Sequence, residues 1–254
     1  MTPADSALVA AAGALAGALN AVAGGGTLVT FPALLATGMA PVTANVTSSV
    51  GLLTGYAGGS VAYRRELGGQ GSRMRSLGPA SVLGGVTGAV ILLVTPAAAF
   101  RAVIPFLILL STALLAVQAP LAAAVARHRR GETAGNEVTW VVRVAVFVGA
   151  VYGSYFGAGL GVLLLGVLGV LIDDELQRLN ALKGLLSLLI NVVGAAVFVL
   201  SGRVAWGYAA ILAVAAYIGG TLGVGVARRL PPSLLRGVVV ILGVVVACVL
   251  LVSR

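Results

Sequence analysis

The sequence has very little charge, one cysteine and one histidine. Only 9% of its 254 residues are charged, whereas a soluble domain carries about 25%. Cys248 has no second cysteine with which to form an internal disulfide. His128 is the only histidine, so a Cys/His metal site or catalytic pair is excluded. We therefore expect no metal, no cofactor and no enzymatic activity.

Acidic residues are also scarce, and none is expected inside an apolar segment. All seven lie at segment ends or in linkers: Asp5, Glu66, Glu132, Glu137, Asp173, Asp174 and Glu175. A buried carboxylate pair is thereby excluded, and with it most mechanisms of membrane hydrolases. Cation carriers commonly need an acidic residue within the membrane, so this class is disfavoured as well.

Apolar residues and glycine fill most of the chain. Hydrophobic residues make up 59% of it, glycine contributes 36 residues, and the mean hydropathy is +1.10. No single core could bury this much apolar surface, so the surrounding solvent must be lipid. The apolar runs are continuous rather than alternating, which favours helices over a β-barrel. We predict an all-α polytopic membrane protein, with residues 1–254 forming a single transmembrane domain.

The basic residues lie in short clusters between the apolar runs. This placement is typical of cytoplasmic loops under the positive-inside rule, and it argues against nucleic-acid binding despite a net charge of +9. Arg73 and Arg75 are expected in one such loop. At the N-terminus, Thr2 and Pro3 predict the cap and first residue of a helix.

The chain divides into two similar halves, residues 1–126 and 138–254, joined by a polar linker at 127–137. They align without a gap at an offset of 135, which places Asn45 on Asn180 and Gly26 on Gly161. The loops of the two halves have opposite charge patterns, so we expect the repeats to be inverted. Eight to ten transmembrane segments are expected, from apolar runs at about 5–23, 24–38, 43–63, 76–95, 100–126, 138–156, 157–172, 177–200, 205–226 and 235–252.

Two of these segments, 24–38 and 157–172, are short and follow glycine clusters. At about 1.5 Å per residue they reach only about 22 Å, less than a hydrocarbon core of about 30 Å. We interpret Gly24, Gly25, Gly26 and Thr27, and likewise Gly157, Gly159 and Gly161, as breaks from which a helix begins inside the membrane. The amides and positive dipole end of such a helix suit an anion. Glycine can instead serve close helix packing.

Polar side chains recur on the segments that follow these breaks. In the second half Asn180, Lys183, Ser187 and Asn191 form one stripe at helical spacing. In the first half a weaker polar patch on the matching helix is formed by Asn45, Thr47, Ser48 and Ser49. A lysine within the membrane is costly and is usually functional. The alternatives are that Lys183 snorkels to the interface and that the asparagines and serines join helices.

The motifs resemble those of the TauE/SafE family of sulfite exporters, also called TSUP. The resemblance is carried by Ala23–Val29 with Phe31–Leu35, Ala44–Ser48, Gly157–Val162, and Leu179–Gly184 followed by Asn191. It covers essentially the whole chain, apart from Leu160, where the family often has glycine. The resemblance implies a multi-pass transporter of the inner (plasma) membrane that handles sulfite, sulfoacetate or other organosulfonates, usually as an exporter.

These observations lead to one hypothesis and several alternatives. An alternating-access carrier would hold the anion between the halves, at the amides of Gly24–Thr27 and Gly159–Gly161, with Asn45, Ser48, Asn180, Lys183 and Asn191. A channel-like anion pathway or a carboxylate carrier on the same fold are alternatives. A membrane-embedded scaffold or enzyme is an alternative from another class. A homodimer is compatible with the sequence but is not dictated by it.

Overall fold

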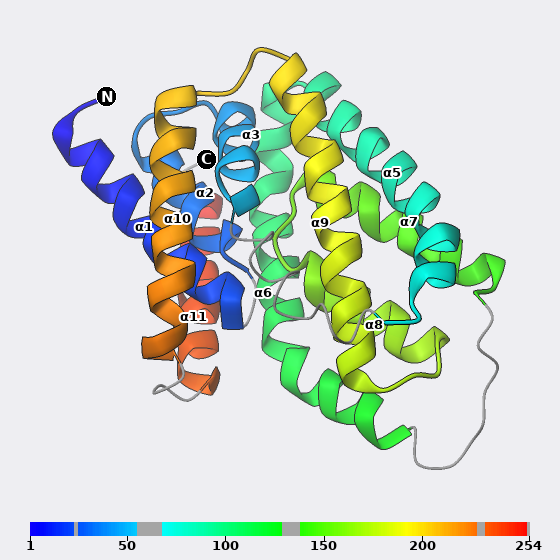
Figure 1. Ribbon diagram of the computed structural model, residues 1–254. Helices are drawn as coiled ribbons and strands as arrows, with labels where there is room; N and C mark the ends of the chain where they lie inside the picture. Colours follow the sequence, from blue (N-terminus) through cyan, green and yellow to red (C-terminus); the bar gives the residue numbers. More distant parts are fainter. Residues whose placement is uncertain (23–24, 55–67, 129–137, 228–231, 253–254) are drawn as a thin grey trace.

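The computed structural model describes residues 1–22, 25–54, 68–128, 138–227 and 232–252 (Figure 1). Within these ranges the chain is α-helical and contains no strand. The helices are α1 (Pro3–Val22), α2 (Thr27–Ala36), α3 (Pro41–Gly51), α5 (Gly71–Val94), α6 (Ala97–His128), α7 (Trp140–Tyr155), α8 (Leu160–Leu171), α9 (Leu176–Leu200), α10 (Trp206–Ala227) and α11 (Pro232–Val252). The prediction of an all-α membrane protein is confirmed.

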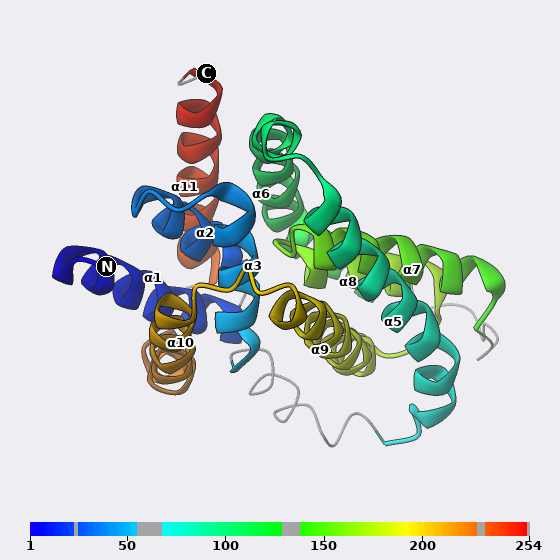
Figure 2. The same cartoon turned by 90° about the horizontal axis from the view of Figure 1, so that it is seen from above.

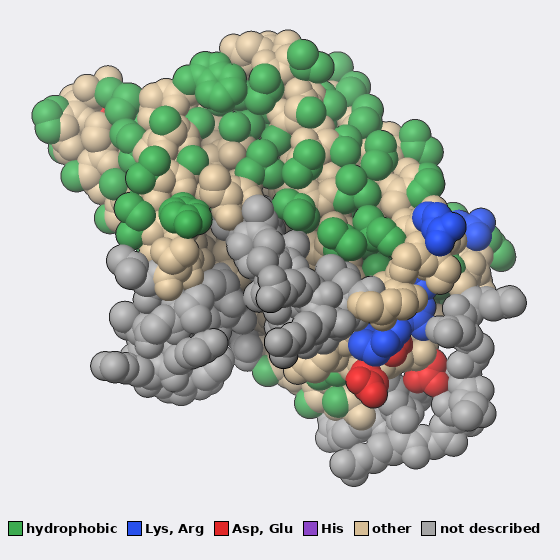
Figure 3. All heavy atoms as spheres, viewed as in Figure 1, with side chains coloured by type: hydrophobic (Ala, Val, Ile, Leu, Met, Phe, Trp, Pro, Cys, Tyr) green, Lys and Arg blue, Asp and Glu red, His purple; other side chains and the backbone are tan. Residues whose placement is uncertain are grey.

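The helices differ in whether they are long enough to cross a bilayer. By length and composition α5, α6 and α9 can each do so. In contrast α2 has 10 residues and α8 has 12, so their axes measure about 15 and 18 Å, which is too short for a core of about 30 Å. Large apolar side chains cover much of the outer surface (Figure 3), as expected for contact with lipid.

Several helix boundaries in the two halves of the chain are separated by the offset of 135. The pairs of starting residues are Pro41 and Leu176, Gly71 and Trp206, and Ala97 and Pro232. Each pair consists of equivalent helices: α3 and α9, α5 and α10, α6 and α11. Three helix starts therefore recur at the offset of 135, although few residues are identical between the two halves.

The two short helices each return the chain to the end of the bundle from which it came. We define the Arg73 end by Arg73, Asp174 and Arg178, which lie together. Arg143 in the first turn of α7 binds Ser76 near the start of α5, so α7 begins at this end. Asp174, just after α8, binds Arg73. Helices α7 and α8 therefore form a hairpin that enters and leaves at the Arg73 end.

The first half has a hairpin of the same kind at the opposite end. We define the Arg203 end by Leu93, Arg203 and Ala205, since Arg203 binds the carbonyl of Leu93. The start of α1 lies here, because Met1 lies beside Gly207. Helix α3 also starts here, because Thr47 accepts from Ala205, whereas Gly51 at the end of α3 lies beside Leu212, further along α10. Helices α1 and α2 therefore enter and leave at the Arg203 end.

The helices pack into two groups that do not coincide with the halves of the sequence. Viewed from above, α1, α2, α10 and α11 lie on one side and α5, α7, α8 and α9 on the other, with α3 and α6 between them (Figure 2). The closest packing joins α1 to α10 and α5 to α7, so each group contains helices of both halves. Glycines at these contacts, including Gly17, Gly88 and Gly219, leave no space for a Cβ atom.

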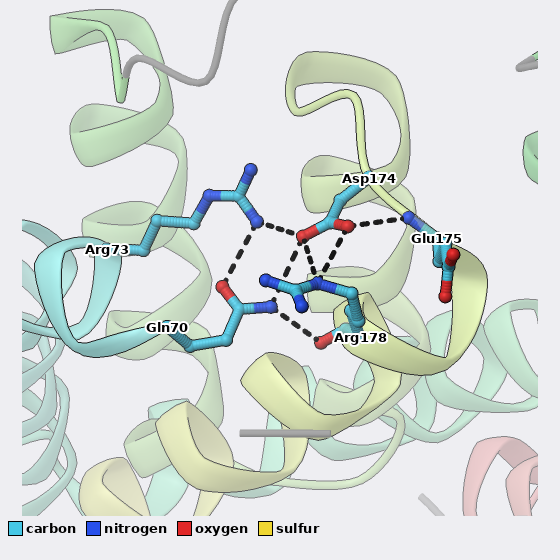
Figure 4. A network of polar contacts seen from close by, with 5 residues as sticks. All are labelled: Gln70, Arg73, Asp174, Glu175 and Arg178. Carbon is cyan, nitrogen blue, oxygen red and sulfur yellow. Dashed lines mark hydrogen bonds and ion pairs between the residues drawn. The ribbon is translucent and has the colours of Figure 1, made fainter. Parts of the chain in front are cut away.

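A polar network closes the Arg73 end (Figure 4). Arg73 and Arg178 both bind the Asp174 carboxylate, and Gln70 bridges Arg73 and Asp174. Arg73 was expected in a solvated loop, but it lies in α5 and is only 4% exposed. Burial acts to raise the pKa of Asp174, yet hydrogen bonds from Arg73, Arg178 and the Glu175 amide outweigh it and hold the pKa below its usual 3.8.

Candidate functional site

The first break lies between α1 and α2 and is organised around Gly25 and Gly26. Gly25 has a φ of 88°, a left-handed conformation that favours glycine. The Gly26 amide donates to the Asn20 side chain of α1 at 2.9 Å. Gly24 lies outside the described residues. The predicted break is confirmed, because α1 ends at Val22 and α2 begins at Thr27.

Side chains of α2 and α3 meet beside this first break. Thr30 lies one turn into α2, where its hydroxyl donates to the Gly26 carbonyl and lies 2.6 Å from the Ser48 hydroxyl of α3. Thr30 and Ser48 are fully buried, and Thr27 is 4% exposed. Ser48 therefore contacts the start of α2, as required if it belongs to the same site as the glycines.

The second break lies between α7 and α8. Gly157 and Gly159 have φ values of 82° and 79°, and Gly159 is the residue before α8. Tyr152 donates its hydroxyl proton to the Ala158 carbonyl at 2.6 Å. The Tyr152 hydroxyl oxygen also lies 2.8 Å from the Ser111 hydroxyl of α6. The break at Gly157–Gly161 is confirmed. Leu160 begins α8 and is buried.

The two breaks lie close to each other within the bundle. Gly25 is next to Leu115 of α6, and Gly159 is next to Leu114. Phe31 of α2 makes an edge-to-face contact with Phe156, with ring centroids 5.5 Å apart. The fold thus brings together two glycine clusters that lie more than a hundred residues apart in the sequence.

Asn45 connects the first half directly to the second break. Its side-chain nitrogen donates to the carbonyl of Tyr155, the last residue of α7, at 2.9 Å. The residue is fully buried, and its side-chain oxygen has no hydrogen-bond partner. Asn180, which aligns with Asn45 at the offset of 135, has a different partner, because its side-chain oxygen accepts from Lys183.

Lys183 lies on α9 beside the start of α8. Its Nζ donates to the Asn180 side-chain oxygen at 3.1 Å. A Cβ atom placed on Gly161 would lie 3.9 Å from both Cδ and Cε of Lys183. Lys183 is seven residues past the first residue of α9, or about 10 Å into the helix. Gly161, Asn180 and Lys183 thus form one cluster.

Asn191 lies apart from this cluster. It is eight residues past Lys183 on α9, or about 12 Å along the axis. Its amide donates to the Ser187 carbonyl of its own helix at 2.8 Å, and it is 8% exposed. Its neighbours on α9 nevertheless contact the end of α7, since Ser154 donates to the Ile190 carbonyl and lies beside Gly194.

Sequence reasoning missed residues that support the first break. Asn20 accepts the Gly26 amide, while its own side-chain nitrogen is buried and has no partner. Thr30 links Gly26 to Ser48. An asparagine six residues before a glycine cluster was a usable signal, but its role depends on α1 and α2 folding back on each other.

The electrostatics of the second cluster favour a negative charge. The start of α8 carries the positive end of the helix dipole, and the Lys183 ammonium lies on the helix beside it. Within the described part of the chain, the amides of Thr27 and Gly161 meet no hydrogen-bond acceptor. A cation next to a helix N-terminus is repulsive, and an anion placed between them would relieve that repulsion.

Comparison with known proteins identifies the family of this chain. The sulfite exporter TauE/SafE family model matches residues 9–250. The chain belongs to the TauE/SafE family. It is 27% identical over 233 residues to a probable membrane transporter protein of Haemophilus influenzae, covering 91% of this chain and 88% of that protein. It is also 26% identical over 241 residues to the probable membrane transporter protein YfcA of Escherichia coli, covering 93% and 86%. No solved structure matches it.

Family membership confirms the resemblance and the general function. Like the TauE/SafE proteins it matches, the chain is a multi-pass membrane protein of a transporter family. The names of its relatives do not specify a substrate.

Proposed function

We propose that this protein exports a small anion, sulfite or an organosulfonate such as sulfoacetate, across the inner membrane by alternating access. The observation that carries the proposal is the position of Lys183 beside the first turn of α8. Two sources of positive potential meet there inside an apolar bundle. The acidic residues nearest in sequence, Asp173–Glu175, precede α9, and Asp174 binds Arg73 and Arg178 instead.

The proposed anion site combines both breaks. Amides at Gly24–Thr27 and Gly159–Gly161 would donate to the anion, and Asn180 and Lys183 would contact it from α9. Ser48 would position the first break and Asn45 the second. Asn191 would contact the anion from further along α9. The three oxygens around the tetrahedral sulfur of a sulfonate point in different directions, so they can accept hydrogen bonds from donors on different helices.

The moving parts follow from the packing. We infer an inverted repeat, with residues 1–126 and 138–254 as its units, because the two hairpins enter from opposite ends and the helix starts recur at 135. Alternating access would rock the group containing α1, α2, α10 and α11 against the group containing α5, α7, α8 and α9, with the breaks between them.

Anion flux into liposomes tests the proposal. We expect Lys183→Ala and Asn180→Ala to lower sulfite flux at least tenfold when combined, because they remove the charge and a donor from the site. Arg101→Ala, which removes an exposed cation far along the chain from the site, should transport normally. Unchanged flux in the double variant would reject the site.

Two further measurements separate the alternatives. Uptake that saturates and is accelerated by anion inside the liposomes supports a carrier, whereas linear flux without counter-transport supports a channel-like pathway. A sulfite or sulfonate that raises the unfolding temperature more than a short carboxylate does supports the sulfur anion. A scaffold would show neither flux nor a ligand-dependent shift.

A further inference from the structure

A groove on the outer surface runs between α5 and α7, away from both helix breaks. Its volume is about 530 Å³, and it is lined by Arg75, Ser76, Pro79, Ala80, Leu83, Arg143, Val144 and Phe147. The two helices run parallel from the Arg73 end, since Ser76 contacts Arg143 and Gly88 contacts Val151 further along. One end of the groove is therefore near the aqueous surface and the other lies deeper.

The two ends of the groove differ in chemistry. Arg75 and Arg143 lie in the first two turns of their helices, and the Arg143 guanidinium donates to the Ser76 hydroxyl at 3.0 Å. Both helix N-termini add positive potential at this end. The deeper end is apolar, lined by Leu83 and Phe147, and Leu83 is 62% exposed. In the space-filling view, basic side chains gather at one edge of the hydrophobic surface (Figure 3).

The depth of the groove matches the boundary of a bilayer. Trp140 begins α7 and is 73% exposed, a placement typical of the aromatic belt at the headgroup level. Leu83 lies eight residues beyond Arg75, which is about 12 Å deeper along α5. Arginines thus lie at headgroup depth and exposed apolar side chains at acyl-chain depth.

We propose that this groove binds one anionic phospholipid, with its phosphate on Arg75 and Arg143 and an acyl chain along Leu83, Val144 and Phe147. A guanidinium pair matches a phosphate through charge-assisted hydrogen bonds. The apolar part of the groove suits an acyl chain, and a free phosphate ion would contact only the basic part. The lipid would hold α7, and with it the α7–α8 hairpin, against α5.

Native mass spectrometry and thermal unfolding of the full chain in detergent test this proposal. Phosphatidylglycerol should bind as one tight equivalent and raise the unfolding temperature, whereas phosphatidylcholine should not. Arg75→Ala with Arg143→Ala should weaken that binding about 30-fold, given the usual attraction between an anionic membrane and two arginines. Arg101→Ala with Arg203→Ala removes the same charge from the Arg203 end and should bind normally.

Two further arms identify which part of the lipid is recognised. Leu83→Ser should weaken the binding of phosphatidylglycerol and leave the binding of inorganic phosphate unchanged. Inorganic phosphate alone should not raise the unfolding temperature of the protein. Equal binding by the two double-arginine variants would overturn the proposal, as would equal stabilisation by phosphate and by lipid. These readouts do not depend on transport, so they are independent of the proposed anion flux.

Discussion

At the scale of single residues, two asparagines of this protein bind backbone groups at the ends of helices. Asn20 accepts from Gly26 at the start of α2, and Asn45 donates to Tyr155 at the end of α7. Helix ends inside a bilayer leave backbone groups without water, so each needs such a partner. Asn20 and Asn45 therefore stabilise the two helix breaks within the lipid bilayer.

Replacing Asn45 tests this role. We expect Asn45→Ala to destabilise the protein by about 1–3 kcal/mol, because the partly buried Tyr155 carbonyl loses its donor. Ser49→Ala is a matched control on the same helix, since the Ser49 hydroxyl bonds only to a carbonyl one turn earlier in α3. Thermal unfolding in detergent measures both variants, and equal unfolding temperatures would contradict the role assigned to Asn45.

Asp174 predicts a pH dependence of stability outside the membrane. Its pKa in the folded protein lies below the usual 3.8, so its contribution to stability is fully present above about pH 4 and is lost as the pH falls through the folded pKa. Asp174→Asn removes this titration and leaves Arg73 without its carboxylate. We expect the variant to be less stable at neutral pH.

The comparison with wild type is made across a range of pH. The stability difference between wild type and Asp174→Asn should shrink as the pH falls below about 4. Urea unfolding in mild detergent, monitored at several pH values, measures it. A difference that stays constant down to pH 2 would show that the Asp174 network does not stabilise the fold.

At the scale of helices, the sequence predicted where the segments lie but not how two of them turn back. The glycine clusters marked both breaks, and the short runs after them marked α2 and α8. The lengths of these runs alone did not decide between a tilted span and a half-helix. Only the contacts of Arg143 with Ser76 and of Asp174 with Arg73 show that α7 and α8 return to one end.

Close helix packing gives a prediction at this scale. A Cβ atom on Gly219 of α10 would lie 1.9 Å from the carbonyl oxygen of Ala14 in α1, so the two helices would have to separate. We expect Gly219→Ala to cost about 1–3 kcal/mol, as overpacking usually does. Gly237→Ala on α11, where a Cβ meets open space, should unfold at the wild-type temperature. Identical unfolding of the two variants would refute the packing argument.

At the scale of the whole molecule, the topology predicts which connections face the same side of the membrane. Ala40 precedes α3 and should share a side with Arg203, whereas Glu175 precedes α9 and should share a side with Ser72. Single cysteines at these four exposed positions, in a Cys248→Ser background, can be labelled with a membrane-impermeant reagent. Labelling of positions 40 and 175 from the same side would contradict two oppositely directed hairpins.

The sequence by itself determined that the chain is a helical membrane protein and where its two breaks lie, because these properties depend on local composition and spacing. The tertiary structure decided which helices pack together. Arg73 became a buried partner of Asp174, Asn45 reached the opposite break rather than mirroring Asn180, and helices of the two halves mixed in each packed group. Such pairings depend on contacts between residues more than a hundred positions apart, and no local pattern in the sequence records them.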